Sequence, residues 1–421
     1  MTESTPNAPP RRAALAFIFI TVMLDILAMG MITPVLPKLI VGLQGNDTAR
    51  AAAIFGLFST VWELMQFLFS PMLGVLSDRY GRRPVILLSN LGLGLDYILM
   101  ALAPNLGWLF VGRVISGVTS ASIATANAYI ADVTPPEKRA ASFGLLGAAF
   151  GVGFVIGPAV GGVLSDVDPH LPFWVAAGLS LANALYGLFV LPESLPPEAR
   201  MGFQWQRANP VGSMGLLRSH PELFGLSLVN FLYNLAHVSL PSVFVLYASY
   251  RYGWSERTVG LSLAGIGVCS MIVQAGLMRP IVSRLGERRT MLLGLWFGAA
   301  GFAIYGLAPT GFVFCLGIPV IGLWGLFGPA AQGIMTRRVS PSEQGQFQGA
   351  LASVMGIAGT LGPGLFTLLF ARAIDPQRAW NQPGAPFLLA SVLLAFGLVL
   401  AWRATRSHPE AATASTPGVA P

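Results

Sequence analysis

Long apolar segments dominate this chain and alternate with short polar ones. A helix rises about 1.5 Å per residue, so about 20 apolar residues are needed to cross a bilayer. Twelve runs of about this length can be read from the sequence. We therefore expect an all-α membrane protein with twelve transmembrane helices, at residues 13–36, 51–72, 84–104, 108–131, 142–165, 172–191, 221–247, 258–280, 290–308, 311–336, 346–370 and 384–403.

The longest polar interruption divides the predicted spans into two groups of six. It covers residues 192–220, which we assign to a central cytoplasmic loop. Residues 13–191 then form an N-terminal six-helix bundle, and residues 221–403 form a C-terminal one. The polar segments 1–12 and 404–421 are predicted to be cytoplasmic tails.

Composition agrees with this membrane assignment. Apolar residues make up 54% of the chain and charged residues only 10%, whereas a soluble domain carries about 25% charged residues. The first apolar run contains Asp25 and is too long for the core of a signal peptide, so we expect an uncleaved span. Cys269 and Cys315 lie in apolar runs and indicate no disulfide framework.

Basic residues gather in the loops on one side of the predicted membrane. If the N-terminus is cytoplasmic, eighteen lysines and arginines lie in cytoplasmic segments and six lie outside. This bias predicts that both termini are cytoplasmic. The net charge of +7 is spread over many loops, so it indicates membrane orientation and no nucleic-acid partner. The six outer residues are Lys38, Arg50, Arg251, Arg257, Arg372 and Arg378.

An internal repeat relates the two halves. A shift of about 205 residues places Gly157-Pro158 on Gly362-Pro363 and the segment 77–83 on 282–288. Because each half has an even number of spans, the repeat is parallel, with its axis along the membrane normal. Duplicated six-span halves are typical of transporters, in which the substrate binds between the halves near the bilayer midplane.

Four charged residues fall inside predicted spans of the N-terminal half, namely Asp25, Glu63, Asp96 and Arg113. A charge at this depth costs about 2.5–3.5 kcal/mol on insertion scales, so such residues usually serve a function. Their distances from the outer ends of their spans place all four in one layer. Burial favours a protonated carboxyl group and a nearby arginine favours the ionised one, so this cluster is predicted to couple proton binding to transport.

Other interpretations of these polar residues remain open. Asp96 and Arg113 could form a purely structural ion pair, and His237 could be a simple hydrogen-bonded helix contact. No carboxylate lies deep in a span of the C-terminal half. We expect a substrate pocket of amide, aromatic and acidic side chains, with Asp25, Gln66, Asn127, Asn230, Asn234 and Gln274 as contacts.

The polar stretch between the second and third spans is the most distinctive motif. We expect a tight loop in which Gly74 allows helices to approach closely and Gly81 allows the chain to reverse. Asp78 can cap a helix or pair with an arginine. Such a loop could latch the two halves on the cytoplasmic side, while its basic residues could also be plain membrane anchors. The proposed gating residues are Gly74, Asp78, Arg79, Gly81, Arg82 and Arg83.

The span at 142–165 is unusually rich in glycine. Small residues at this density predict close helix packing, and Pro158 predicts a bend. The spacing of Gly151 and Gly153 could suggest a nucleotide-binding loop, but an apolar span lacks the required strand–helix context.

These motifs resemble those of the major facilitator superfamily over nearly the whole chain. The loop signature of that family is matched at Gly74, Asp78, Arg79, Gly81, Arg82 and Arg83, and its span 4 arginine at Arg113. The resemblance implies a two-bundle transporter without enzymatic activity. A motif associated with proton-driven antiporters is matched at Gly153, Gly157, Pro158, Gly161 and Gly162.

Within that family the chain looks like the tetracycline/proton antiporters, on the residues around Asp25 and Asp96. The resemblance implies exchange of a metal–tetracycline cation for a proton. Two positions depart from that group: Ser270 and Gly298 stand where it usually has a histidine and an aspartate. Glu63 conversely stands where the group is apolar, which suggests a relocated proton site.

We therefore expect a proton-coupled antiporter that exports small amphipathic drugs, with tetracycline as the first candidate. The alternative is a facilitator or proton-coupled importer of a small organic solute. A membrane enzyme is disfavoured, because no Walker-type, metal-ligating or Gly-x-Ser-x-Gly motif is present. We expect no cofactor, Mg²⁺ only within the substrate complex, a monomer, and the bacterial inner membrane.

Overall fold

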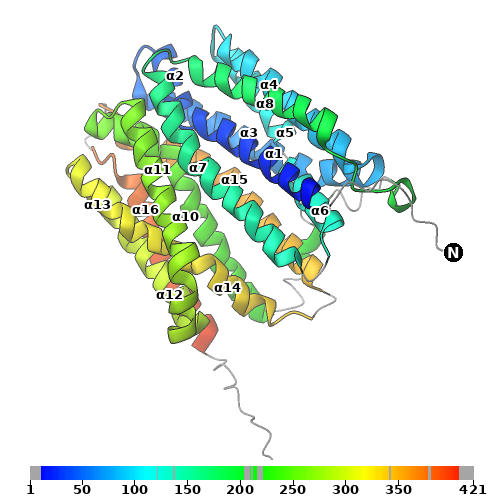
Figure 1. Cartoon of the computed structure of the whole chain (residues 1–421). Coiled ribbons are helices and arrows are strands. Elements are labelled where there is room, and N and C mark those ends of the chain that lie inside the picture. The colour runs from blue at the N-terminus through cyan, green and yellow to red at the C-terminus, as the bar shows by residue number, and fades with distance from the viewer. Residues whose placement is uncertain are drawn as a thin grey trace, which may run out of the picture.

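The chain folds as two bundles of α-helices that lie side by side (Figure 1). The computed structural model describes residues 11–120, 122–135, 138–202, 209, 212–215, 221–340, 343–377 and 381–406. The first bundle contains α1 (Arg11–Ile32), α2 (Leu36–Leu43), α3 (Thr48–Tyr80), α4 (Arg82–Ala101), α5 (Leu106–Thr119), α6 (Ser122–Val133), α7 (Arg139–Ser165) and α8 (Leu171–Val190). The second contains α10 (Pro221–Tyr252), α11 (Glu256–Ile272), the π-helix η4 (Val273–Leu277), α12 (Met278–Leu307), α13 (Gly311–Gly322), the 3-10 turn η5 (Leu323–Leu326), α14 (Phe327–Thr336), α15 (Gln344–Ala373) and α16 (Ala385–Arg406).

The predicted twelve crossings are confirmed. Ten helical segments of the described chain are long and apolar enough to span a membrane. One of them, Glu256–Leu307, has 52 residues and turns at Gly286, so it supplies two crossings. The shorter apolar helix α5 continues into α6 and supplies the twelfth.

Some predicted span edges shift in the structure. The run at 108–131 is split into α5 and α6, and the run at 311–336 is interrupted by η5. Helix α1 already includes residues 11 and 12, and α16 extends to Arg406. The rest of both predicted tails, and residues 203–208, 210–211 and 216–220 of the central loop, lie outside the described residues.

The internal repeat is visible in the backbone. Gly81 and Gly286, which are 205 residues apart, both have positive φ angles, of 106° and 75°. Asn105 and Thr310 have the same separation, and each caps its helix by accepting a hydrogen bond from the backbone N–H three residues on. The sequence repeat is therefore a structural repeat, which relates α5 to α13 and the α3–α4 turn to the bend in α12.

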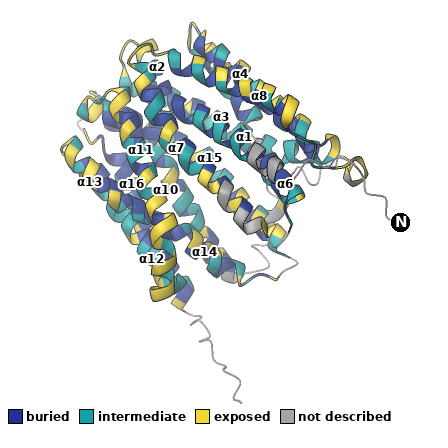
Figure 2. Cartoon of the chain, in the orientation of Figure 1, coloured by how far each residue is buried: buried dark blue, intermediate teal, exposed yellow. Residues whose placement is uncertain are grey.

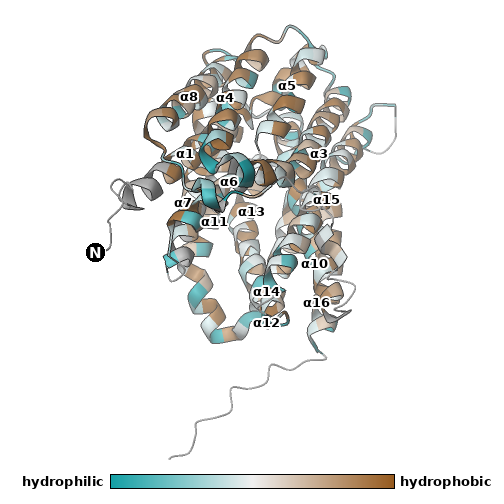
Figure 3. Cartoon of the chain, turned by 90° about the vertical axis from the view of Figure 1, so that its right-hand side faces the viewer, coloured by the Kyte–Doolittle hydropathy of each residue, from teal (hydrophilic) through white to brown (hydrophobic). Residues whose placement is uncertain are grey.

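Exposed residues and hydrophobic residues both occur along the lengths of the helices (Figures 2 and 3), and many large apolar side chains are exposed. Phe189 is 78% exposed, Phe312 is 74% exposed and Leu88 is 68% exposed. In water such a surface would be unfavourable, whereas lipid tails solvate it well. The hydrophobic helix faces are thus suited to the hydrocarbon core of a membrane.

The bundles meet along two antiparallel helix pairs, α3 with α15 and α7 with α11. Glycines allow the close approach in the first pair. A Cβ placed on Gly56 would lie 1.8 Å from Thr367 Oγ1, and one on Gly356 would lie 2.2 Å from the Phe67 ring. We call the α3–α15 contact the inter-bundle seam. It matters for function because Glu63 lies on it.

Candidate substrate and proton site

Asp96 and Arg113 are brought together between α4 and α5, as the sequence predicted. Asp96 is 1% exposed, and its Oδ1 lies against Gly112, where an added Cβ would be only 2.8 Å away. Arg113 interacts electrostatically with Asp96, Tyr97 and Glu63, and its guanidinium carbon lies 4.9 Å from the centroid of the Trp62 ring. Among the described residues, no group meets normal hydrogen-bond geometry with either carboxylate oxygen of Asp96, although the Ser116 hydroxyl lies close enough to interact with it. The pair therefore interacts at longer range than a direct ion pair, which leaves the Asp96 oxygens available to a proton.

Glu63 extends this cluster to the boundary between the bundles. Its carboxylate packs against α15, where a Cβ on Gly359 would lie 2.7 Å from Glu63 Oε2. It also interacts electrostatically with Arg113. Glu63 thus links the buried charges of the first bundle to the seam that must rearrange if the bundles move.

Asp25 lies deeper in the first bundle, between α1, α4 and α8. It is 8% exposed, and Asn183 Nδ2 donates to its Oδ1 at 3.0 Å. The Asn90 amide, in the orientation that satisfies its neighbours, donates to Oδ2 at 3.0 Å. Tyr97 lies near enough to both Asp25 and Asp96 to interact electrostatically with each. Asn90 and Asn183 were not among the predicted site residues, although an asparagine inside an apolar span is itself a signal.

The amides predicted to contact substrate come from both bundles. Gln66 and Asn127 are half-buried in the first bundle, and Gln274 is exposed on η4. Asn234 Nδ2 donates to Asn230 Oδ1 at 3.2 Å and to the Asn230 carbonyl at 2.7 Å. Asn234 is therefore held by Asn230 in this conformation. Gln274 is exposed on a π-helical segment, a feature frequent at functional sites.

The two departures from the tetracycline antiporters have different surroundings. Ser270 is half-buried near the end of α11. Gly298 is buried in α12 beneath Trp324, and a Cβ there would lie 2.5 Å from Trp324 Cδ1. An aromatic side chain therefore covers the position for which the resemblance implies an acid.

The stretch 74–83 is not the loop that we expected. Helix α3 continues to Tyr80, and only Gly81 leaves the helical conformation before α4 begins at Arg82. The predicted close packing at Gly74 is wrong, because a Cβ there would have no neighbour within 4 Å. The predicted reversal at Gly81 is confirmed by its φ of 106°.

The charges of this stretch hold the first bundle together. Arg82 bonds Asp78 on α3 and, at 3.1 Å, Asp132 on α6. The carboxylate of Glu193, after α8, accepts the Arg82 backbone N–H at 2.9 Å and also that of Arg83. It thereby caps the N-terminus of α4, where the helix dipole stabilises a negative charge. Glu193 falls in the predicted central loop, and its capping role is visible only in the structure.

The glycines of α7 pack closely against α1 of the first bundle and α11 of the second, which confirms the predicted close helix packing. A Cβ on Gly161 would lie 2.0 Å from the Met31 carbonyl of α1, and one on Gly157 would lie 2.8 Å from Gly30 Cα. On the other side, a Cβ on Gly162 would lie 2.6 Å from the carbonyl of Glu256 on α11. Gly153 contacts Ile26 in the same way, and helix α7 runs through Pro158 without interruption.

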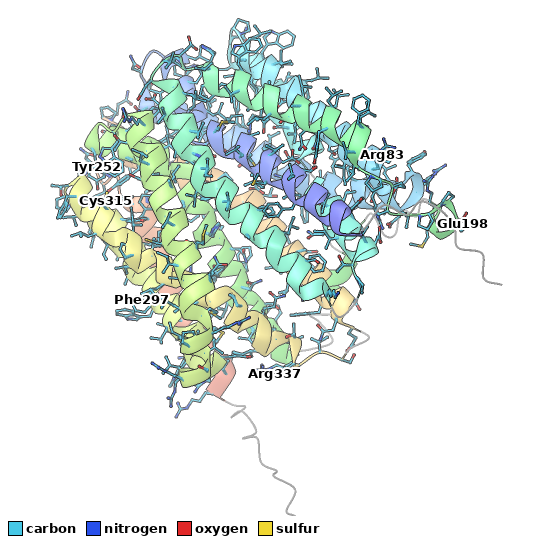
Figure 4. All side chains as sticks on the ribbon, viewed as in Figure 1. Arg83, Glu198, Tyr252, Phe297, Cys315 and Arg337 are labelled. Carbon is cyan, nitrogen blue, oxygen red and sulfur yellow. The ribbon has the colours of Figure 1, made fainter. Side chains whose placement is uncertain are left out.

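Ion pairs distinguish the two ends of the molecule. At the end opposite the termini, Lys38 Nζ is 3.3 Å from Glu256 Oε2 and donates to the Trp254 carbonyl, which joins the bundles. At the terminal end, where α1 begins and α16 ends, the ion pairs between described residues each join helices of one bundle. Figure 4 shows Arg83 and Arg337 there on separate bundles. The bundles are thus pinned together at the opposite end.

Comparison with known proteins agrees with this architecture. The family model described as Major Facilitator Superfamily matches residues 18–318 and 275–420. The chain is 37% identical to the class C tetracycline resistance protein of Escherichia coli over 93% of this chain and 98% of that protein. It is also 37% identical to the class G protein of Vibrio anguillarum, over 88% and 93%.

Solved structures share the fold. A bacterial homologue of the human lysosomal transporter Spinster, in an inward-facing and occupied conformation, gives a TM-score of 0.76 at 17% identity. The match covers 96% of this chain and 98% of that one. Two six-helix bundles with buried charges at their boundary define a multi-pass membrane transporter. This chain belongs to the major facilitator superfamily.

Proposed function

We propose that this transporter is a proton-coupled antiporter that exports small amphipathic drugs, with the magnesium complex of tetracycline as the first candidate. The tetracycline resistance proteins that cover almost the whole chain support the substrate class. In this proposal Mg²⁺ enters only as part of the substrate. The protein works as a monomer in a bacterial inner membrane, with both termini cytoplasmic.

The observation that carries the coupling is the position of Glu63. Its carboxylate lies on the inter-bundle seam against Gly359 and is linked through Arg113 to Asp96. Moving a charged carboxylate through an apolar helix contact is costly, and a neutral carboxyl group moves at lower cost. Proton binding at this cluster would therefore change the energy of rearranging the bundles.

The substrate would bind between the bundles and reach the same cluster. A cationic substrate near Glu63 and Asp96 would favour their ionised forms, so substrate and proton would compete. Because substrate and proton compete for the same carboxylates, the transporter would exchange one for the other across the membrane. Lys38 and Glu256 join the bundles at the end opposite the termini. This contact fits a conformation that accepts substrate from the cytoplasm.

Inside-out vesicles with an acidic interior test the proposal directly. Addition of tetracycline with Mg²⁺ should release protons and load the vesicle with drug. Proton release driven by other amphipathic cations alone would keep the antiporter and change the substrate. Vesicles that lose preloaded solute together with protons would instead identify the importer.

A further inference from the structure

Four aromatic rings gather in the second bundle at the depth of the substrate site. Tyr233 and His237 lie one turn apart in the middle of α10, Trp324 lies on η5, and Phe327 begins α14. The Tyr233 ring stacks on Phe327 with centroids 4.2 Å apart, and it lies 4.8 Å from Trp324. The His237 ring lies 5.4 Å from Trp324.

Gly298 makes room for this arrangement. The Cδ1 edge of Trp324 rests on Gly298, where any larger residue would displace it. The indole nitrogen of Trp324, Nε1, is bonded to this Cδ1 atom. It is buried and has no acceptor among the described residues, while Trp324 as a whole is 4% exposed. A buried donor without a partner is costly, so it indicates a place for an acceptor supplied from elsewhere.

His237 marks the open side of the cluster. It is exposed although it lies in the middle of a transmembrane helix. An imidazole facing lipid would be unfavourable, and this ring turns toward the buried Trp324. Gln274 lies on the neighbouring wall, since its Cγ would be 3.9 Å from a Cβ on Gly325. His237 therefore borders the space between the bundles, with Tyr233 half-buried beside it and the buried Trp324 and Phe327 directly behind.

Charge divides the site into two unlike parts. The carboxylates within spans, Asp25, Glu63 and Asp96, all belong to the first bundle. The acidic residues of the second bundle lie at or near helix ends or in loops: Glu222, Glu256, Glu287, Glu343 and Asp375. A substrate between the bundles would meet carboxylates on one side and aromatic rings on the other.

We propose that Tyr233, His237 and Trp324 form an aromatic subsite that takes the planar conjugated rings of the substrate. A ring carbonyl or phenolic oxygen accepts a hydrogen bond from Trp324 Nε1, and the cationic part faces the carboxylates of the first bundle. This inference rests on the proposed function and adds the orientation of the substrate. Aromatic stacking and one buried hydrogen bond together favour planar oxygenated molecules over aliphatic cations.

Direct binding to the purified full-length protein tests the subsite. Tetracycline with Mg²⁺ and doxorubicin serve as planar probes, and tetrapentylammonium serves as an aliphatic cation. Trp324→Phe keeps the ring but removes the donor, and should raise the Kd for both planar probes about tenfold. His237→Ala should weaken the same probes and leave tetrapentylammonium unchanged.

Trp296→Phe is the matched control, because Trp296 lies on α12 but is 53% exposed. It should bind all three probes like the wild type. Equal planar-probe affinities in Trp324→Phe and Trp296→Phe would overturn the subsite, as would a wild type that binds neither planar probe. A Trp324→Phe effect on binding, with no drug-driven proton release in wild-type vesicles, would support the subsite and reject export.

Discussion

Single buried charges distinguish this transporter, and Glu63 is the one best placed to couple a proton to movement. It is the carboxylate that faces the other bundle, whereas Asp25 is held by Asn90 and Asn183 inside its own. Both amide donors to Asp25 belong to helices of the first bundle and would move with it. Proton exchange during the cycle is therefore expected at Glu63 and Asp96 more than at Asp25.

Glu63→Gln should abolish drug-driven proton release while the protein folds normally. Glutamine has the same shape and fits the space beside Gly359, but it binds no proton in this pH range. Vesicle assays at matched protein levels measure the effect. Glu198→Gln, at an exposed site labelled in Figure 4, is the control and should transport normally. Unchanged proton release in Glu63→Gln would remove this residue from the coupling mechanism.

At the scale of the helices, the contacts of α7 decide which of its glycines are required for packing. The glycine-rich helix α7 carries glycines whose Cβ would meet backbone atoms and one, Gly147, whose Cβ would have no neighbour within 4 Å. Composition does not separate the two kinds, because a run of glycines does not show which face meets α1 or α11. The structure separates them by the space available for one methyl group.

Gly161→Ala should destabilise the protein by about 1–3 kcal/mol, the usual cost of overpacking. The new Cβ would lie 2.0 Å from a backbone carbonyl at Met31, which has no freedom to move aside. Thermal unfolding in detergent measures the loss. Gly147→Ala in the same helix has no neighbour within 4 Å and should unfold like the wild type or later. Equal unfolding temperatures of Gly161→Ala and Gly147→Ala would show that α7 and α1 are farther apart than in this structure.

The turn between α3 and α4 depends on Gly81. Gly81→Ala places a side chain at positive φ and 2.2 Å from the Glu193 carboxylate. Strain of this kind costs about 1–3 kcal/mol, and displacement of Glu193 would also uncap α4. The unfolding temperature should therefore fall. Gly178→Ala, in the interior of α8 with open space around it, should have no such effect.

At the scale of the whole molecule, ion pairs join the two bundles at the end opposite the termini. The Lys38–Glu256 pair connects the bundles, and Arg257 Nη1 lies 3.8 Å from Asp166 Oδ2 nearby. Partly exposed pairs contribute up to about 1 kcal/mol each. Small energies of this size are sufficient to shift a balance between two conformations.

Lys38→Ala should open the end opposite the termini in a larger fraction of molecules, by up to about fivefold. Spin labels at Asp168 and Phe312, in a background without the two cysteines, would report the distance between the bundles. The distribution should gain a longer component, and Arg50→Ala should leave it unchanged. A Lys38→Ala distribution like that of the wild type would show that other contacts close this end.

The twelve spans, the two halves and the repeat follow from the sequence alone. The energy of placing 20 apolar residues in lipid is a local property of each run, and duplicated turn residues such as Gly81 and Gly286 keep their spacing. The layer of Asp96, Arg113 and Glu63 was also predictable, because depth follows from counting residues along straight helices. Properties that depend only on the local sequence or on spacing along the chain could therefore be predicted without the tertiary structure.

Only the tertiary structure decided which side chains meet. The rotation of each helix places Asp25 among amides of α4 and α8, Glu63 on α15, and Trp324 over Gly298. The capping role of Glu193 likewise depends on a contact between residues more than 100 positions apart. These contacts arise from packing between distant segments, and a periodic apolar pattern contains no record of them.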